Sequence, residues 1–172
     1  MGKIIFILGG AKSGKSSFAL KIARKQKNIL FIATAQPTDL EMRERIKKHK
    51  KQRPKNWETL EIKNALLEIH EKKFNVAIFD CLTIFVSNCM LLGETERYIM
   101  EKVKDFLTKI ANKNKMVIVV SNEVGCGIVP KNKVARKFRD ILGNVNQTVS
   151  SLANKVYYMI AGIPVLIKKE GK

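Results

Sequence analysis

The fold is decided by residues 4–16, which read Ile4-Ile5-Phe6-Ile7-Leu8-Gly9-Gly10-Ala11-Lys12-Ser13-Gly14-Lys15-Ser16. The five apolar residues predict a buried strand, and the remainder fits the phosphate-loop pattern G-x-x-x-x-G-K-S that connects a strand to a helix. In such a loop backbone N–H groups point at phosphates, the lysine adds a cation and the serine offers a hydroxyl to Mg²⁺. A plain glycine turn would need neither Lys15 nor Ser16. The run therefore predicts that a nucleoside triphosphate is held by Gly9, Gly10, Ala11, Lys12, Ser13, Gly14, Lys15 and Ser16.

A second apolar run, Val76-Ala77-Ile78-Phe79-Asp80, ends in an acid. Phosphate-loop enzymes hold their metal between the loop hydroxyl and an aspartate on a neighbouring strand. We therefore predict a Mg²⁺ site formed by Ser16 and Asp80. An aspartate that simply caps a helix or turn after the strand is the alternative.

Apolar runs alternate with longer helical patterns over the 172 residues, which favours an α/β fold with a mostly parallel central sheet flanked by helices. The length fits one phosphate-loop NTPase-like domain spanning residues 1–172. Strands are predicted near 3–8, 29–34, 75–80 and 116–121, and helices near 15–26, 38–52, 63–73, 94–113 and 132–153. The last helix could break at Gly143 and Asn144. Residues 155–160 and 164–168 flank a turn at Ala161 and Gly162, which predicts an antiparallel pair at the sheet edge.

The bulk composition excludes several classes of protein. No apolar stretch is long enough to span a membrane, and the three cysteines form no CxxC pair, so we expect neither a zinc site nor a disulfide framework, and a cytoplasmic location. The net charge of +18 is unusual and could mark a nucleic-acid partner. Because the lysines are spread along the chain without interleaved aromatic residues, we expect a solvated basic surface and no specific nucleic-acid binding.

His49 lies in Lys47-Lys48-His49-Lys50-Lys51, within the predicted helix 38–52. Thr38 and Glu41 have the spacing of a capping box at the start of that helix. Met42, Ile46 and His49 recur at helical spacing, which predicts that the imidazole continues a partly buried stripe. An imidazole beside a bound triphosphate can attack phosphorus and form a phosphoramidate. The bland alternative is a surface histidine in a charged helix, which is also our interpretation of His70.

Several blocks together resemble one known family over nearly the whole chain. They are residues 9–16, Ile32-Ala33-Thr34-Ala35-Gln36, Glu41-Met42 through Arg45-Ile46 to His49-Lys50, Arg53-Pro54 with Trp57 and Glu61, residues 121–130 with Asn122-Glu123-Val124-Gly125, residues 135–140, and Gly143 with Val145-Asn146-Gln147. The chain resembles the bifunctional adenosylcobinamide kinases/adenosylcobinamide-phosphate guanylyltransferases of cobalamin biosynthesis.

This resemblance implies two reactions: ATP or GTP phosphorylates adenosylcobinamide, and GMP from GTP is then attached to adenosylcobinamide phosphate. It implies that His49 carries the guanylyl group, that Glu61 reads the guanine, and that the protein is a homotrimer using Mg²⁺. The further nucleotide contacts implied by position are Thr34, Ala35, Gln36, Lys50, Lys51, Gln52, Arg53 and Asp80.

Two features depart from the family pattern. Some members carry two adjacent histidines where this chain has Lys48-His49, and the family often has Glu where this chain has Asp80. Two other functions compete with the resemblance: a basic nucleotide-hydrolysing switch that binds RNA or DNA, and a small-molecule kinase with a single activity. A switch that binds RNA or DNA needs neither a histidine in the helical block nor the Asn122-Glu123-Val124-Gly125 segment.

Overall fold

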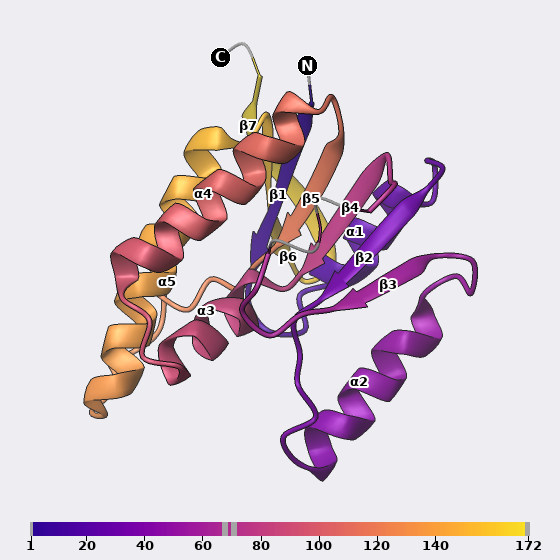
Figure 1. Cartoon of the computed structure of the whole chain (residues 1–172). Coiled ribbons are helices and arrows are strands. Elements are labelled where there is room, and N and C mark those ends of the chain that lie inside the picture. Colours follow the sequence, from indigo (N-terminus) through magenta and orange to yellow (C-terminus); the bar gives the residue numbers. More distant parts are fainter. Residues whose placement is uncertain (1, 67–68, 70–71, 171–172) are drawn as a thin grey trace.

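The computed structural model describes residues 2–66, 69 and 72–170, and its strands form one sheet in the order β3-β2-β4-β5-β1-β6-β7 (Figure 1). All neighbouring pairs from β3 to β6 are parallel, and β6 pairs with β7 antiparallel. This confirms the predicted α/β class and the antiparallel edge pair. The strands are β1 (Lys3–Gly9), β2 (Ile29–Ala33), β3 (Glu58–Glu61), β4 (Val76–Asp80), β5 (Met116–Val120), β6 (Lys155–Ile160) and β7 (Ile163–Lys169).

Helices cover both faces of the sheet (Figure 1). They are α1 (Lys15–Ala23), α2 (Leu40–Gln52), α3 (Leu82–Leu91), α4 (Glu96–Asn112) and α5 (Lys133–Leu152). Phe6 of β1 belongs to the buried cluster beneath α3, α4 and α5, whereas the next residue, Ile7, belongs to the cluster beneath α1. Because successive side chains point to opposite faces and both faces are covered, β1 is apolar at every position from 4 to 8.

The predicted helix 63–73 is wrong where the structure describes it. Residues 63–66, 72 and 73 are not helical and Ile69 lies in a 3₁₀ turn, while 67–68 and 70–71 fall outside the described residues. The spacing that suggested a helix arises because Leu66 and Ile69 are buried in the cluster beneath α3 and α4 as the chain crosses from β3 to β4. Burial by tertiary contacts here produces an apolar spacing without a helix.

Two elements escaped prediction for opposite reasons. The strand β3 (Glu-Thr-Leu-Glu) has no apolar run, because it lies at the sheet edge and its residues are exposed or half-buried. The helix α3 (Leu-Thr-Ile-Phe-Val-Ser-Asn-Cys-Met-Leu) is apolar almost all round, so it shows no helical periodicity.

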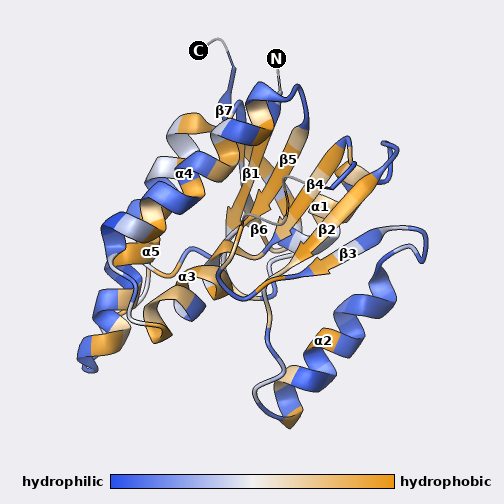
Figure 2. Cartoon of the chain, viewed as in Figure 1, coloured by the Kyte–Doolittle hydropathy of each residue, from blue (hydrophilic) through white to orange (hydrophobic). Residues whose placement is uncertain are grey.

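The helix α2 differs from its prediction in two details. Its cap is Asp39, whose carboxylate accepts from the Met42 N–H at 2.7 Å, and not Thr38. None of its residues is buried, and Figure 2 shows it as mainly hydrophilic beside the apolar strands. The helix α5, by contrast, runs unbroken through Gly143. No described helix is both long and apolar enough to cross a membrane.

Candidate active site

Three strands bring the predicted phosphate and metal residues to one edge of the sheet. The strand β5 lies between β1, which leads into the phosphate loop, and β4, which ends at Asp80. Val120 at the end of β5 is in register with both Ile7 and Asp80. The carboxyl ends of parallel strands are where ligands bind in α/β folds.

The phosphate loop has the tight backbone that its sequence predicts. Gly14 caps α1 with a φ of +93°, and a Cβ there would lie 3.2 Å from Gly162 Cα in the β6–β7 turn. Lys15 is buried, and its Nζ donates to Gly10 O at 2.5 Å. Burial lowers the pKa of the Lys15 ammonium. The lysine therefore curls back over its own loop, where it can contact phosphate oxygens.

Ser16 and Asp80, the residues of the predicted Mg²⁺ site, lie close together. The Ser16 hydroxyl lies near enough to the Asp80 carboxylate to lower its pKa by hydrogen bonding, and Lys15, Arg53 and His49 are all close enough to act on it electrostatically. Burial raises the pKa of Asp80, and the Ser16 hydrogen bond and these cations oppose that rise. A hydroxyl and a carboxylate together are hard oxygen donors suited to Mg²⁺, which commonly takes few protein ligands and completes its shell with phosphates and water.

Thr34 has a structural role in this arrangement. It is fully buried, and its hydroxyl donates to Cys81 O and accepts from the Cys81 N–H, both at 2.8 Å. The Thr34 hydroxyl therefore links the end of β2 to the end of β4, and both of its hydrogen bonds are made to the backbone of Cys81. The two predicted nucleotide contacts that follow Thr34 have different surroundings. Ala35 lines a cavity, and the Gln36 side chain donates to Ile62 O at 3.3 Å.

A cavity of about 640 Å³ adjoins this edge between α2 and the ends of β2 and β3. Lys50 and Glu61 face each other across it in an ion pair of 2.5 Å, with both side chains more than half exposed. Such an exposed pair is weak and can exchange for a ligand. The cavity is lined by Ala35, Pro37, Arg43, Ile46, Lys47, Lys50, Lys51, Arg53, Lys55 and Glu61.

Arg53 joins the cavity to the metal site. Its guanidinium stacks on the Phe31 ring at 3.6 Å, and desolvation lowers its pKa while Asp80 and Glu61 act in the opposite direction. Its buried Nε and Nη1 have no hydrogen-bond partner among the described residues. A buried guanidinium with unused donors is costly unless a ligand supplies the acceptors, and the anionic oxygens of a phosphate fit that geometry.

His49 lies on α2 among residues that line this cavity, but it is more exposed than predicted. Met42 and Ile46 are half-buried, whereas His49 is exposed, so the stripe ends before it. The reason is that α2 lies beyond the edge strand β3, where the sheet offers no further surface to cover it (Figure 1). His49 nevertheless lies within electrostatic reach of Asp80. Lys51 and Gln52 complete the last turn of α2 and are exposed.

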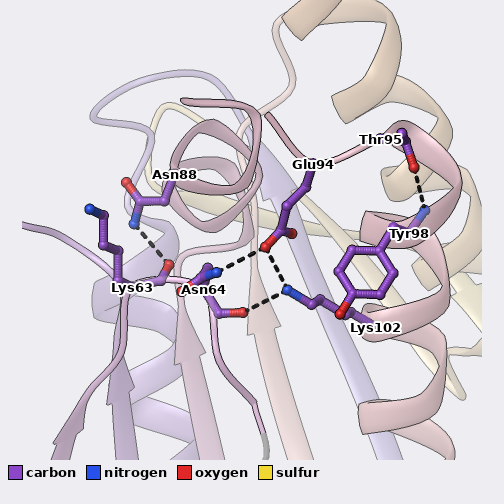
Figure 3. A network of polar contacts seen from close by, with 7 residues as sticks. All are labelled: Lys63, Asn64, Asn88, Glu94, Thr95, Tyr98 and Lys102. Atoms are coloured by element: carbon purple, nitrogen blue, oxygen red, sulfur yellow. Dashed lines mark hydrogen bonds and ion pairs between the residues drawn. The ribbon is translucent and has the colours of Figure 1, made fainter. Parts of the chain in front are cut away.

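Sequence reasoning missed Asn88. This buried residue of α3 donates through Nδ2 to Thr34 O and to Lys63 O, each at 3.0 Å, and so joins the segments that leave β2 and β3. Figure 3 shows the adjoining network, in which Glu94 accepts from Asn64 at 2.8 Å and from Lys102 at 2.7 Å. The available signal was a lone amide within the apolar sequence of α3.

The chain is similar to known proteins over nearly its whole length. The family model "Cobinamide kinase / cobinamide phosphate guanyltransferase" matches residues 5–167. The chain is 35% identical to the bifunctional adenosylcobalamin biosynthesis protein CobU of Escherichia coli and 36% identical to that of Salmonella typhimurium, each match covering 96% of this chain and 99% of the relative. It is 35% identical to the bifunctional protein CobP of Pseudomonas aeruginosa, over 95% of this chain and 96% of that protein.

A solved structure supports the fold alone. The KaiC-like protein PH0186 of Pyrococcus horikoshii superposes with a TM-score of 0.53 at 15% identity, covering 91% of this chain and 70% of that one.

Proposed function

The chain belongs to the cobinamide kinase/cobinamide phosphate guanyltransferase family, and from this membership we propose how its residues divide the two reactions. The enzyme is a bifunctional cobinamide kinase and guanylyltransferase. The observation that carries the proposal is a phosphate loop that shares one sheet edge with Asp80. Arg53 and His49 act electrostatically on Asp80, and Arg53 and residues of α2, the helix that carries His49, line a cation-rich cavity.

In the first reaction, we propose, adenosylcobinamide takes the γ-phosphoryl group of ATP or GTP. Its aminopropanol hydroxyl oxygen bonds to the γ-phosphorus as the bond to the β–γ bridging oxygen breaks, leaving a nucleoside diphosphate. Lys15 and the loop N–H groups stabilise the charge on the phosphoryl oxygens. Ser16 and Asp80 would hold Mg²⁺, which neutralises charge on the triphosphate when bound.

In the second reaction an imidazole nitrogen of His49 attacks the α-phosphorus of GTP and pyrophosphate leaves. A phosphate oxygen of adenosylcobinamide phosphate then attacks the guanylyl phosphorus, which releases His49 and gives adenosylcobinamide-GDP. Arg53 fits the charge that develops at phosphorus, because its unused buried donors point to an anionic ligand. Splitting the transfer through a covalent intermediate replaces one difficult step by two easier ones.

The two reactions need different reacting atoms beside one nucleotide, so we propose that α2 shifts between them. The absence of buried residues in this helix supports the idea, because little packing opposes its movement. The Lys50–Glu61 ion pair would open when guanine arrives.

The protein is proposed to act as a homotrimer. The support from the structure is a row of exposed apolar side chains on the edge hairpin formed by β6 and β7, namely Ile160, Ile163, Val165, Leu166 and Ile167. An exposed apolar edge strand is a natural site of self-association.

Labelling with GTP that carries a labelled α-phosphate tests the covalent step. Wild-type protein should retain the label after denaturation, and His49→Ala should lose it while still phosphorylating adenosylcobinamide. The matched control is His70→Ala, which replaces the only other histidine and should label normally. Undiminished labelling of His49→Ala would contradict the assignment.

A further inference from the structure

One motif remains without a role in the two reactions above. The segment Asn122-Glu123-Val124-Gly125 directly follows β5. Because Val120 is in register with both Ile7 and Asp80, the chain leaving β5 emerges between the phosphate loop and the metal residues. In a kinase this is the space in front of the γ-phosphoryl group, since Lys15 would contact the outer phosphates here while Ser16 and Asp80 would hold Mg²⁺.

The backbone of this segment is fixed against the phosphate loop. Ser121 N donates to Ile7 O at 3.0 Å, and Glu123 N donates to Gly9 O at 3.1 Å. Gly9 is the first residue of the phosphate loop, so this hydrogen bond fixes the backbone of Glu123 relative to the loop.

A buried polar cluster of Thr83, Ser121 and Asn146 fixes Asn122 as well. Asn122 N donates to Thr83 Oγ1 at 2.7 Å, and Asn146 Nδ2 donates to Asn122 O at 3.1 Å. Ser121 Oγ donates to Asn146 Oδ1 at 2.7 Å. Because the three side chains are hydrogen-bonded to one another and to the backbone of Asn122, the conformation of the backbone before Glu123 is restricted.

Further along the segment two guanidinium groups brace the loop. Arg139 donates to Gly125 O and Gly127 O, and Arg136 donates to Pro130 O and Lys131 O. The loop is therefore held at both ends.

The side chain of Glu123 is available for chemistry. It is half-buried, and Oε1 accepts from the Gly125 N–H at 2.5 Å, which sets the orientation of the carboxylate. No cation forms an ion pair with it among the described residues, although the chain has a net charge of +18 and Glu61 and Glu94 are both paired. An oriented carboxylate with no cation bound to it can accept a proton.

We propose that Glu123 is the general base of the kinase reaction. Its carboxylate takes the proton of the acceptor hydroxyl as that oxygen bonds to the γ-phosphorus. The bond from the γ-phosphorus to the bridging oxygen breaks, its electron pair leaves with the nucleoside diphosphate, and the proton passes from Glu123 to solvent. This assignment rests on the kinase reaction of the proposed function and leaves the chemistry of His49 untouched.

The pair Glu123→Gln and Glu123→Asp tests the proposal in the purified full-length protein. Loss of a general base costs on the order of 10²–10⁴ in rate, so Glu123→Gln should lower kcat for phosphorylation of adenosylcobinamide by that factor. It should also remove the fall of kcat at low pH that a general base predicts for wild type. Glu123→Asp should recover part of the rate and restore that pH dependence.

Labelling of His49 by GTP is the internal reference, because that reaction involves no acceptor hydroxyl. In Glu123→Gln the rate of labelling should stay within about twofold of wild type, whereas loss of the general base lowers the kinase rate by about 10²–10⁴. The matched control is Asp140→Asn, which removes an exposed carboxylate from α5 and should change neither reaction.

Three results would overturn the assignment: a kinase kcat in Glu123→Gln close to wild type, a loss that is the same at every pH, or a parallel loss of labelling. If wild type phosphorylates its acceptor but takes up no label, the guanylyl-histidine proposal fails and Glu123 is unaffected.

Discussion

Glu61, which the resemblance implies to read the guanine base, forms an ion pair with Lys50 in the structure. Lys50 lies one residue after His49, so the residue proposed to recognise the base also contacts α2. A carboxylate can accept from guanine N1–H and N2–H, whereas the corresponding edge of adenine lacks that pair of donors. In the proposed function, binding of guanine exchanges this exposed ion pair for two charged hydrogen bonds.

We expect Glu61→Gln to weaken the preference for GTP over ATP in nucleotidyl labelling. Charged hydrogen bonds contribute roughly 1.5–3 kcal/mol each, which corresponds to about tenfold to hundredfold in binding. The ratio of labelling rates with the two nucleotides measures the effect. Glu58→Gln on the same strand is the control, since Glu58 pairs with Lys72 and does not line the cavity. An unchanged ratio in Glu61→Gln would mean that the base is read elsewhere.

At the scale of elements, α3 and α4 hold the segment after β3 in place. Asn88 donates to Lys63 O in this segment and to Thr34 O after β2, which fixes the two segments to each other. Lys102 of α4 pairs with Glu94 while donating to Asn64 O (Figure 3). Only 13% of the Glu94 side chain and 19% of the Lys102 side chain are exposed. A pair this buried matters more to stability than the surface pairs of the chain, because removing one partner leaves the other desolvated.

Glu94→Gln should lower the free energy of unfolding at pH 7 by about 1–3 kcal/mol. Burial would raise the pKa of Glu94, but hydrogen bonds from Lys102 and Asn64 leave it below the ordinary value of 4.5. The contribution of the pair is therefore complete above pH 4.5 and is lost as pH falls through the lowered pKa. Urea unfolding of both proteins should accordingly show a difference at pH 7 that shrinks in acid.

The exposed pair of Arg97 and Glu101 supplies the control for this measurement, and Glu101→Gln should leave the unfolding curve unchanged. A difference between Glu94→Gln and wild type that persisted unchanged into strong acid would show that the charge of Glu94 is not what stabilises the segment.

For the whole molecule, the apolar hairpin of β6 and β7 predicts the route of assembly. Its turn also contacts the phosphate loop, since Gly162 N donates to Ser13 O at 3.1 Å. Placing a charge in this surface, as in Ile167→Glu, should shift the proposed trimer towards monomer in sedimentation velocity. Leu91→Glu, at a still more exposed apolar position at the end of α3, should leave the trimer intact. If Ile167→Glu sediments like wild type, assembly uses another surface.

The net charge of +18 predicts weak attraction to any polyanion and no selectivity. Binding to a random RNA oligomer should have a dissociation constant no tighter than roughly 10⁻⁴–10⁻⁶ M and should weaken steeply with salt. Labelling of the protein at saturating GTP should persist at salt concentrations that release the RNA oligomer. The reason is that Lys15 is buried, so its contacts are screened less than those of exposed lysines. Tight oligomer binding that survives salt, without protein-bound GMP, would instead favour a nucleic-acid function.

The sequence by itself determined the features that depend on local pattern. The run from Ile4 to Ser16 specifies a strand, a phosphate loop and a helix, because apolar period, glycine placement and the lysine all act within a few residues. The parallel sheet and its antiparallel edge follow from similar runs farther along the chain. The roles of His49, Glu61 and the metal residues rest on chemistry and resemblance, and they stay predictions.

Only the tertiary structure decided what depends on neighbours distant in sequence. Burial of Leu66 and Ile69 beneath α3 and α4 imitates a helix in a segment that forms none where it is described, and the edge position of β3 leaves His49 exposed. The Thr34 hydroxyl is occupied by Cys81, which lies 47 residues away. Glu123 owes its place to a strand register that sets Val120 between Ile7 and Asp80. The spacing of apolar residues in the sequence indicates which side chains are buried. Which residues cover them depends on the order of the strands in the sheet, which is a property of the tertiary structure.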